Sequence, residues 1–161
     1  MEPVSEQQIR TAFANLTKGE ASRVNLPSDL AARPWEDLDF LGWSDPKAPQ
    51  RAYLVAERDG RLRAFGLRLS HDGSGPRRTM CSLCLTVGNV ALMVAPRAGR
   101  SGQAGNTVGT YICADLACSL YVRDKLKVPG QIARETLAVE QKVQRLVDNL
   151  DAFIARVLRA A

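Results

Sequence analysis

The sequence predicts an α+β fold, in which a small antiparallel sheet packs with an N-terminal helix and a long C-terminal helix. Three observations support this class. Apolar residues recur at three- and four-residue steps over residues 139–158. An Asp59-Gly60 pair separates two largely apolar runs, as in a tight hairpin turn. Finally, all four cysteines stand in two close pairs, at positions 81 and 84 and at 113 and 118.

We expect a single domain over residues 1–161, whose first part, residues 1–76, holds a helix, a Pro- and Trp-rich segment and a β-hairpin. Ser5 and Gln8 have the spacing of a capping box, and Gly19 suits the end of the helix that begins there. The apolar face of this helix is formed by Ile9, Ala12, Phe13 and Leu16.

The Pro- and Trp-rich segment is expected to contain a short helix that begins at Pro34. Trp35 and Trp43 are interpreted as core or lid residues, with an exposed aromatic anchor for a partner as the alternative. The hairpin follows from Arg51 onward.

The cysteines Cys81, Cys84, Cys113 and Cys118 predict one tetrahedral zinc site, because Zn²⁺ takes four thiolates at about 2.3 Å. No ligand position would remain open, so we expect a structural ion. Two disulfides or a redox-active C-x-x-C pair are the alternatives. The start of the sequence shows no secretory signal and no apolar run near eighteen residues, so we expect a cytoplasmic protein that does not cross a membrane.

Residues 77–127 are expected to form the zinc lobe. A cysteine knuckle is followed by a strand at 90–95, a basic glycine-rich connection at 97–106, a returning strand at 107–112 and a helix within 114–125. Knuckle, hairpin and helix in this order indicate a treble clef. The connection lacks a phosphate-loop motif, and we expect a flexible tip, either free of contacts or used for recognition.

The charge is concentrated in this lobe, which has seven basic and two acidic residues in a chain of formal net charge +5. A basic lobe favours an acidic partner, either RNA or an acidic protein surface, although such charges also serve solubility alone. The candidate partner-binding residues are Arg97, Arg100, Arg123, Lys125 and Lys127.

The last part, residues 128–161, is expected to form the long helix, with Thr136 as its cap. Its apolar stripe predicts packing against the first helix and the sheet, or else an interface with a second copy or a partner helix.

Four stretches carry a family resemblance: PWEDLDFLGW (34–43), MCSLCLT (80–86), VAPRAGR (94–100) and NTVGTYICADLACS (106–119). They resemble the treble-clef domain of the FusB-type proteins that bind elongation factor G, including single-domain actinobacterial relatives. The resemblance implies a zinc lobe that docks on elongation factor G and promotes its release from the ribosome, which in FusB relatives gives fusidic acid resistance. FusB-type resistance proteins carry an additional N-terminal helical bundle, whereas here a short helix and the Pro/Trp-rich segment precede the sheet.

The leading hypothesis is therefore a non-enzymatic adaptor for elongation factor G. The alternative is an RNA- or ribosome-binding zinc protein that uses the same basic face. An enzyme is disfavoured, because the sequence shows no nucleophile with a base, no suggestive carboxylate pair and no open metal site. We accordingly expect no small-molecule substrate.

Overall fold

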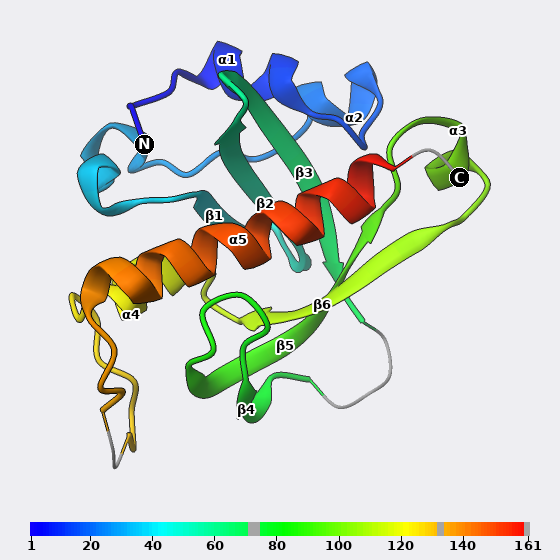
Figure 1. Cartoon of the computed structure of the whole chain (residues 1–161). Helices are drawn as coiled ribbons and strands as arrows, with labels where there is room; N and C mark the ends of the chain where they lie inside the picture. The colour runs from blue at the N-terminus through cyan, green and yellow to red at the C-terminus, as the bar shows by residue number, and fades with distance from the viewer. Residues whose placement is uncertain (71–74, 132–133, 160–161) are drawn as a thin grey trace.

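The computed structural model describes residues 1–70, 75–131 and 134–159 of the 161-residue chain. Within them one antiparallel sheet has the strand order β1-β2-β3-β5-β4, and β6 pairs with the other edge of β5 (Figure 1). The strands are β1 Leu41–Asp45, β2 Ala48–Arg58, β3 Arg61–Leu69, β4 Arg77–Met80, β5 Val87–Pro96 and β6 Thr107–Cys113. The helices are α1 Glu6–Ala12, α2 Lys18–Ser22, α3 Gly99–Gln103, α4 Cys118–Val122 and α5 Val139–Leu158, with 3-10 turns η1 Leu30–Ala32 and η2 Trp35–Asp37.

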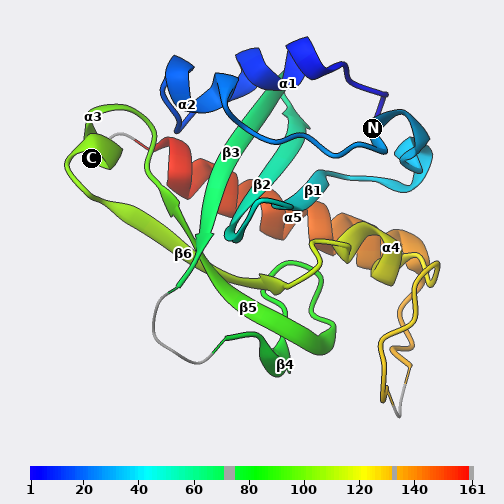
Figure 2. The ribbon, with the colours of Figure 1, turned by 180° about the vertical axis from the view of Figure 1, so that it is seen from behind.

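Helices cover both faces of the sheet. The long helix α5 lies across one face, and α1 and α2 lie on the other (Figures 1 and 2). Because side chains alternate along a strand, Leu54 of β2 faces α5 while the adjacent Tyr53 faces α1. A strand covered on both faces buries consecutive residues, which explains the unbroken buried run 52–56 in β2. The predicted α+β architecture with a long C-terminal helix is confirmed.

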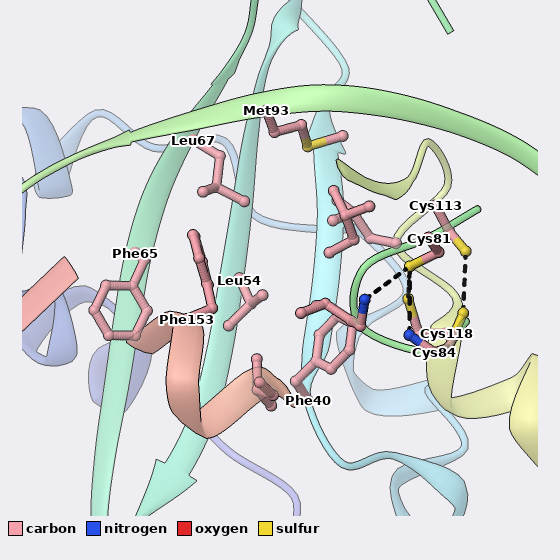
Figure 3. Packing of buried hydrophobic residues seen from close by; sticks show 14 of the residues in the cluster. Phe40, Leu54, Phe65, Leu67, Cys81, Cys84, Met93, Cys113, Cys118 and Phe153 are labelled. Carbon is pink, nitrogen blue, oxygen red and sulfur yellow. Dashed lines mark hydrogen bonds between the residues drawn. The ribbon is translucent and has the colours of Figure 1, made fainter. Parts of the chain in front are cut away.

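The larger core lies between the sheet and α5 and continues into the cysteine cluster (Figure 3). Phe65 and Leu67 of β3 pack there with Phe153 of α5. The apolar stripe of α5 is buried against the sheet, as predicted; the buried members are Leu146, Leu150, Phe153, Ile154 and Val157. The expected packing against the first helix is wrong, because α1 covers the opposite face of the sheet. The helix begins at Val139 rather than after Thr136, and the Ala138 amide donates to the Gln141 side chain at 3.1 Å.

The N-terminal helix is shorter than its apolar spacing predicted. The Ser5 and Gln8 capping box is present, but α1 ends at Ala12 because Phe13 turns extended and bridges to Ala64 of β3. A second capping box, between Thr17 and Glu20, then starts α2. Gly19 therefore lies inside this second helix, and its assignment as a helix end was wrong.

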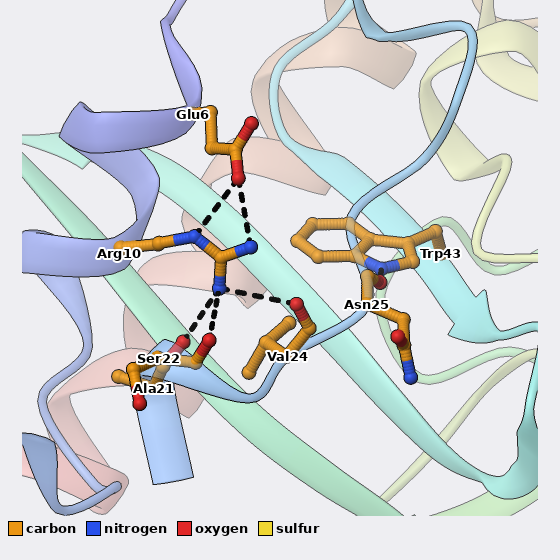
Figure 4. Close-up of polar contacts among 7 residues, drawn as sticks. All are labelled: Glu6, Arg10, Ala21, Ser22, Val24, Asn25 and Trp43. Atoms are coloured by element: carbon orange, nitrogen blue, oxygen red, sulfur yellow. Dashed lines mark hydrogen bonds and ion pairs between the residues drawn. The ribbon is translucent and has the colours of Figure 1, made fainter. Parts of the chain in front are cut away.

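Polar contacts join the two N-terminal helices. Arg10 of α1 pairs with Glu6 and donates to the carbonyls of Ala21, Ser22 and Val24 at 2.9 to 3.1 Å (Figure 4). Such charge-assisted bonds satisfy the carbonyls at the end of a short helix and fix α2 against α1.

The Pro- and Trp-rich segment differs most from expectation. Pro34 precedes a single 3-10 turn in place of the expected short helix, and residues 41–45 form strand β1, which was not predicted. Trp35 and Trp43 are 7% and 5% exposed, which confirms that they are core residues. The Trp43 indole donates to the Asn25 carbonyl at 2.9 Å.

The two predicted hairpins are present. Asp59 and Gly60 both adopt positive φ, 50° and 69°, as a type I′ turn requires, and β2 pairs with β3 in continuous register. The second hairpin, β5 with β6, is closed by residues 97–106, which contain the helical turn α3. The expected contact-free tip is wrong for this connection, because the Ala98 amide donates to the carbonyl of Val157 in α5 at 2.9 Å.

Among the described residues, no helix is both long enough and apolar enough to cross a membrane.

Candidate metal centre

The four cysteine sulfurs form a compact buried cluster. All four Sγ atoms lie within 4.8 Å of one another. Cys81 and Cys118 are 3.7 Å apart, and Cys84 and Cys113 are 3.6 Å apart. A tetrahedron with Zn–S bonds of about 2.3 Å has S–S edges of about 3.8 Å. The cluster therefore fits a single structural zinc ion held by four thiolates.

The first cysteine pair sits in a zinc knuckle. The Cys81 sulfur accepts from the amides of Leu83 and Cys84, both at 3.4 Å. Leu85 then adopts φ 58° and donates its amide to the Cys81 carbonyl at 3.0 Å. Amide donors aimed at a sulfur stabilise the thiolate form that binds zinc.

The second pair is joined by a different turn with a longer spacing. The Leu116 amide donates to the Cys113 carbonyl at 2.9 Å, and Leu116 adopts φ 58°. Asp115 accepts from the amide of Ala117 at 3.0 Å, so the two extra residues form a tight turn. Cys118 follows as the first residue of α4. The predicted helix is present but begins at Cys118 and is much shorter than residues 114–125, because the left-handed Leu116 delays its start.

The electrostatics of the cluster favour a bound cation. Hydrogen bonds from Cys113 and Cys118 lower the pKa of the Cys81 thiol far below its ordinary value. The pKa of Cys118 is raised, because its hydrogen bonds to Cys113 and Cys81 and its burial favour the protonated form. Four buried sulfurs at this separation therefore cannot all ionise alone, whereas a coordinated divalent ion deprotonates thiols outright.

Helix α5 supports the knuckle from outside the cluster. Arg145 donates to the Cys84 carbonyl at 3.4 Å, and Asn149, one turn later, donates to the Leu83 carbonyl at 2.9 Å. Glu135 fixes the Arg145 guanidinium with two hydrogen bonds of 2.6 and 2.8 Å. The same contact lowers the pKa of Glu135. These residues act on the metal through the backbone of its ligands.

The N-terminal part of the chain holds the other side of the lobe. Arg123, just after α4, makes a two-pronged contact with Asp39 at 2.6 and 3.0 Å. The two side chains are only 17% and 10% exposed. The Asp39 backbone amide also donates a hydrogen bond to the Ser119 hydroxyl at 3.0 Å. A partly buried, bidentate pair of this kind fixes the position of α4.

Sequence reasoning missed Asp39, Arg145 and Asn149. The spacing of Arg145 and Asn149 places both on one face of α5, but nothing in the sequence names the carbonyls that they reach. Asp39 lies 84 residues from its partner, and no local pattern connects the two.

The five predicted partner-binding residues do not form one surface. Arg97 donates to the Arg156 carbonyl near the C-terminal end of α5 at 2.9 Å, and Arg100 is exposed in the neighbouring α3. The other three follow α4, where Asp124 contacts Lys142 near the N-terminal end of α5. Positions 142 and 156 are about 21 Å apart along a helix that rises 1.5 Å per residue. The basic residues therefore lie at opposite ends of α5 (Figure 1).

The five basic residues also differ in how free they are to contact a partner. Arg123 is already paired with Asp39 in an ion pair. Lys125 lies 3.8 Å from Asp37, but its side chain is 59% exposed. Lys127 is exposed, and so is the apolar Leu126 between the two lysines. Asp37 and Asp39 lie outside residues 77–127, the segment that carries the excess of positive charge. Their contacts with Lys125 and Arg123 therefore partly neutralise that excess in the folded protein.

Knuckle, β-hairpin and a helix that carries the last ligand, assembled around four buried cysteines, define a treble-clef zinc-finger protein. The family model of the FBP C-terminal treble-clef zinc-finger matches residues 8–157. The chain therefore belongs to this family, that of the FusB-type proteins. No curated protein matches the sequence.

Among solved structures, the chain is similar in fold to the fusidic acid resistance protein FusC, with a TM-score of 0.63 at 18% sequence identity. The match covers 96% of this chain and 59% of the FusC chain. The chain thus spans less than two thirds of FusC.

Proposed function

We propose that this protein is a non-enzymatic, zinc-containing adaptor that binds translation elongation factor G in the cytoplasm and promotes its release from the ribosome. Membership of the FusB-type family carries the proposal. The likeness to a fusidic acid resistance protein supports a translation factor as the kind of partner. The zinc has a structural role here, because its four protein thiolates leave no position for a substrate.

The docking surface is the segment that follows α4, residues 124–127. It offers two exposed lysines, Lys125 and Lys127, on either side of Leu126, which is 39% exposed. An apolar side chain flanked by cations suits an acidic protein surface with an apolar centre. The segment directly follows Arg123, whose position is fixed by its contact with Asp39, so we expect little ordering entropy to be lost when the segment binds.

Arg97 and Arg100 have a separate place in the proposal. They lie beside the far end of α5, and Arg97 is already engaged with the Arg156 carbonyl. A partner as large as a translation factor reaches both ends of α5, but the surface beside the cysteine cluster and α4 presents only the lysine segment. The two groups therefore make separable contributions to binding.

The test is a calorimetric titration of elongation factor G with zinc-loaded protein, in which the affinity is measured at about 50 mM and about 300 mM salt. We expect weaker binding at high salt, because contacts between exposed charges are screened. The variant Lys125→Glu/Lys127→Glu should lose at least about tenfold in affinity, since it places like charges on an acidic partner. Absence of binding by wild-type protein at low salt would refute the adaptor hypothesis.

The matched control is Arg156→Glu/Arg159→Glu, which makes the same change in net charge at the far end of α5, where both side chains are exposed and neither is a candidate partner-binding residue. An equal loss of affinity in both variants would mean that net charge, and not the lysine segment, governs binding. Release from the ribosome is checked separately, by the rate at which labelled elongation factor G leaves ribosomes stalled with fusidic acid. Wild-type protein should accelerate this step, and the lysine variant should not.

A further inference from the structure

One part of the sheet carries an exposed row of side chains that the zinc lobe does not use. Arg51 of β2 lies opposite Arg68 of β3, Arg68 lies opposite Val94 of β5, and Val94 lies opposite Gly109 of β6. Residues directly opposite in a sheet point to the same face. This row therefore crosses four strands, a span of about 14 Å at about 4.8 Å per strand.

A second row lies beside the first. Leu92 is two residues from Val94 on β5 and pairs with Tyr111 of β6. Both therefore share the face of the arginines. Tyr111 is 39% exposed, and Leu92 and Val94 are half-buried. Gly109 adds no side chain, so the floor between Val94 and Tyr111 stays low.

The face opposite α5 is covered only up to this point. A Cβ on Gly66, two residues before Arg68 on β3, would lie 2.8 Å from the side chain of Leu16, and Asn15 donates to the carbonyls of Gly66 and Pro96. The link between α1 and α2 thus ends over Gly66. On this face, no helix of the described chain crosses the region where β3 pairs with β5 and β5 pairs with β6 (Figure 2).

The two arginines have no ion-pair partner among the described residues, and both are exposed. Glu20 is a neighbouring carboxylate: its pKa is lowered first by hydrogen bonds from Thr17 and then by the charges of Arg23 and Arg51. It makes no ion pair with Arg51 within the described chain. Two guanidinium groups directly opposite one another repel, so their pairing weakens the sheet. An anionic ligand between them would relieve that repulsion.

We infer that this face, defined by Arg51, Arg68, Leu92, Val94 and Tyr111, binds single-stranded RNA. Paired arginines suit the phosphates of the backbone, and an exposed tyrosine on a sheet of small and aliphatic side chains suits the stacking of an unpaired base. Ser70 continues the alternation of β3 on the same face, where its amide donates to the Leu92 carbonyl. A side-chain hydroxyl is a group that can hydrogen-bond the 2′-hydroxyl that distinguishes RNA from DNA.

The site is separate from the lysine segment assigned to elongation factor G, so either assignment can fail alone. The probe is a fluorescein-labelled 12-nucleotide oligouridylate, titrated with full-length zinc-loaded protein and followed by anisotropy from about 50 to 300 mM salt. The slope of log affinity against log salt is negative, and Arg51→Gln/Arg68→Gln should make it shallower by about 1.4, since each lost phosphate contact removes about 0.7. Because the substitutions remove a repulsion, this variant should fold normally.

Tyr111→Ala should weaken binding about 5- to 150-fold, the range for one stacked base, while Tyr111→Phe keeps wild-type affinity. The charge-matched control is Arg61→Gln/Arg159→Gln. Arg61 is seven residues from Arg68, about 23 Å away on the same strand, and faces the other side of the sheet. The control should keep the wild-type affinity at every salt concentration.

Four results would overturn the inference. The first is no binding of the oligouridylate at about 50 mM salt, and the second is an equal loss of affinity in the charge-matched control. The third is an affinity for duplex RNA, or for DNA of the same sequence, equal to the affinity for the probe. The fourth is displacement of the probe by an acidic polypeptide as effectively as by unlabelled RNA. The last result would assign the face to an acidic protein.

Discussion

Gly42 is the position where the N-terminal part of the chain approaches the zinc turn most closely. A Cβ built on Gly42 in β1 would lie 2.5 Å from the Cβ of Leu116 and 3.2 Å from the ring of Phe40. Carbon atoms in contact are separated by about 3.5 to 4.0 Å, so Gly42→Ala requires a displacement of about 1 Å. The clash involves a Cβ, which rotamer changes cannot move.

The displacement must therefore pass into the backbone of Leu116, whose amide is bonded to the Cys113 carbonyl. Overpacking of a well-packed core costs about 1 to 3 kcal/mol. For a chain of this size that corresponds to a decrease in melting temperature of about 2 to 12 °C. Because the strain falls on the second zinc turn, we also expect faster transfer of zinc to a competing chelator.

The assay compares thermal unfolding and the rate of zinc transfer for Gly42→Ala and Gly109→Ala. Gly109 is also inside a strand, but a Cβ there meets Leu92 and Val94 at 3.4 and 3.6 Å, which is ordinary contact. The control should therefore melt within about 2 °C of wild type, as expected for a change of about 0.5 kcal/mol. If Gly42→Ala matched wild type in both measurements, the close packing of β1 on the zinc turn would be refuted.

Three further predictions concern the metal, the ion pair and acid stability. Cys81→Ser and Cys118→Ser should each lower the zinc content below about half an equivalent and remove cooperative unfolding, because the metal contributes directly to folding. Metal analysis and calorimetry measure these two effects, and a variant that retained a full equivalent of zinc would contradict the prediction. Asp39→Ala should lower the free energy of unfolding in urea by about 3 kcal/mol, since it leaves Arg123 partly buried without a partner, whereas removal of the exposed Asp29 from its pair with Arg33 should cost under about 1 kcal/mol. Burial opposes ionisation of Asp45, but hydrogen bonds from Lys47, Asn25 and Tyr53 prevail and lower its pKa. Its contribution is therefore complete above the unfolded pKa of about 3.9 and is lost as the pH falls through the lower folded value, so Asp45→Asn should flatten the melting temperature between about pH 5 and pH 2; an unchanged pH profile would contradict this.

The sequence was most informative where a feature depends on neighbouring residues. The Ser5 capping box, the Asp59-Gly60 turn and the two cysteine pairs each have local geometry that dictates the residues, and all three are present in the structure. The long C-terminal helix was equally predictable, because its apolar stripe repeats over 20 residues.

Features that depend on distant parts of the chain were not predictable. The helix expected up to Gly19 is broken because Phe13 bridges to Ala64, which is 51 residues away. Strand β1 was missed because its pairing with β2, rather than its own composition, makes it a strand. The candidate basic residues lie within one segment of the sequence, but the β5–β6 hairpin places Arg97 and Arg100 at the far end of α5 from the other three.

The attachment of the zinc knuckle to α5 has a consequence for the order in which the protein forms. Synthesis proceeds from the N-terminus, so both cysteine pairs are complete before Arg145 and Asn149 are made. The knuckle can then bind its ion early, but the carbonyls of Leu83 and Cys84 gain their partners only when the final helix docks. The same docking buries Leu146 and four other apolar residues of that helix. The metal lobe is thus a template that α5 completes, and this core reaches its full stability only after α5 has been made and has docked.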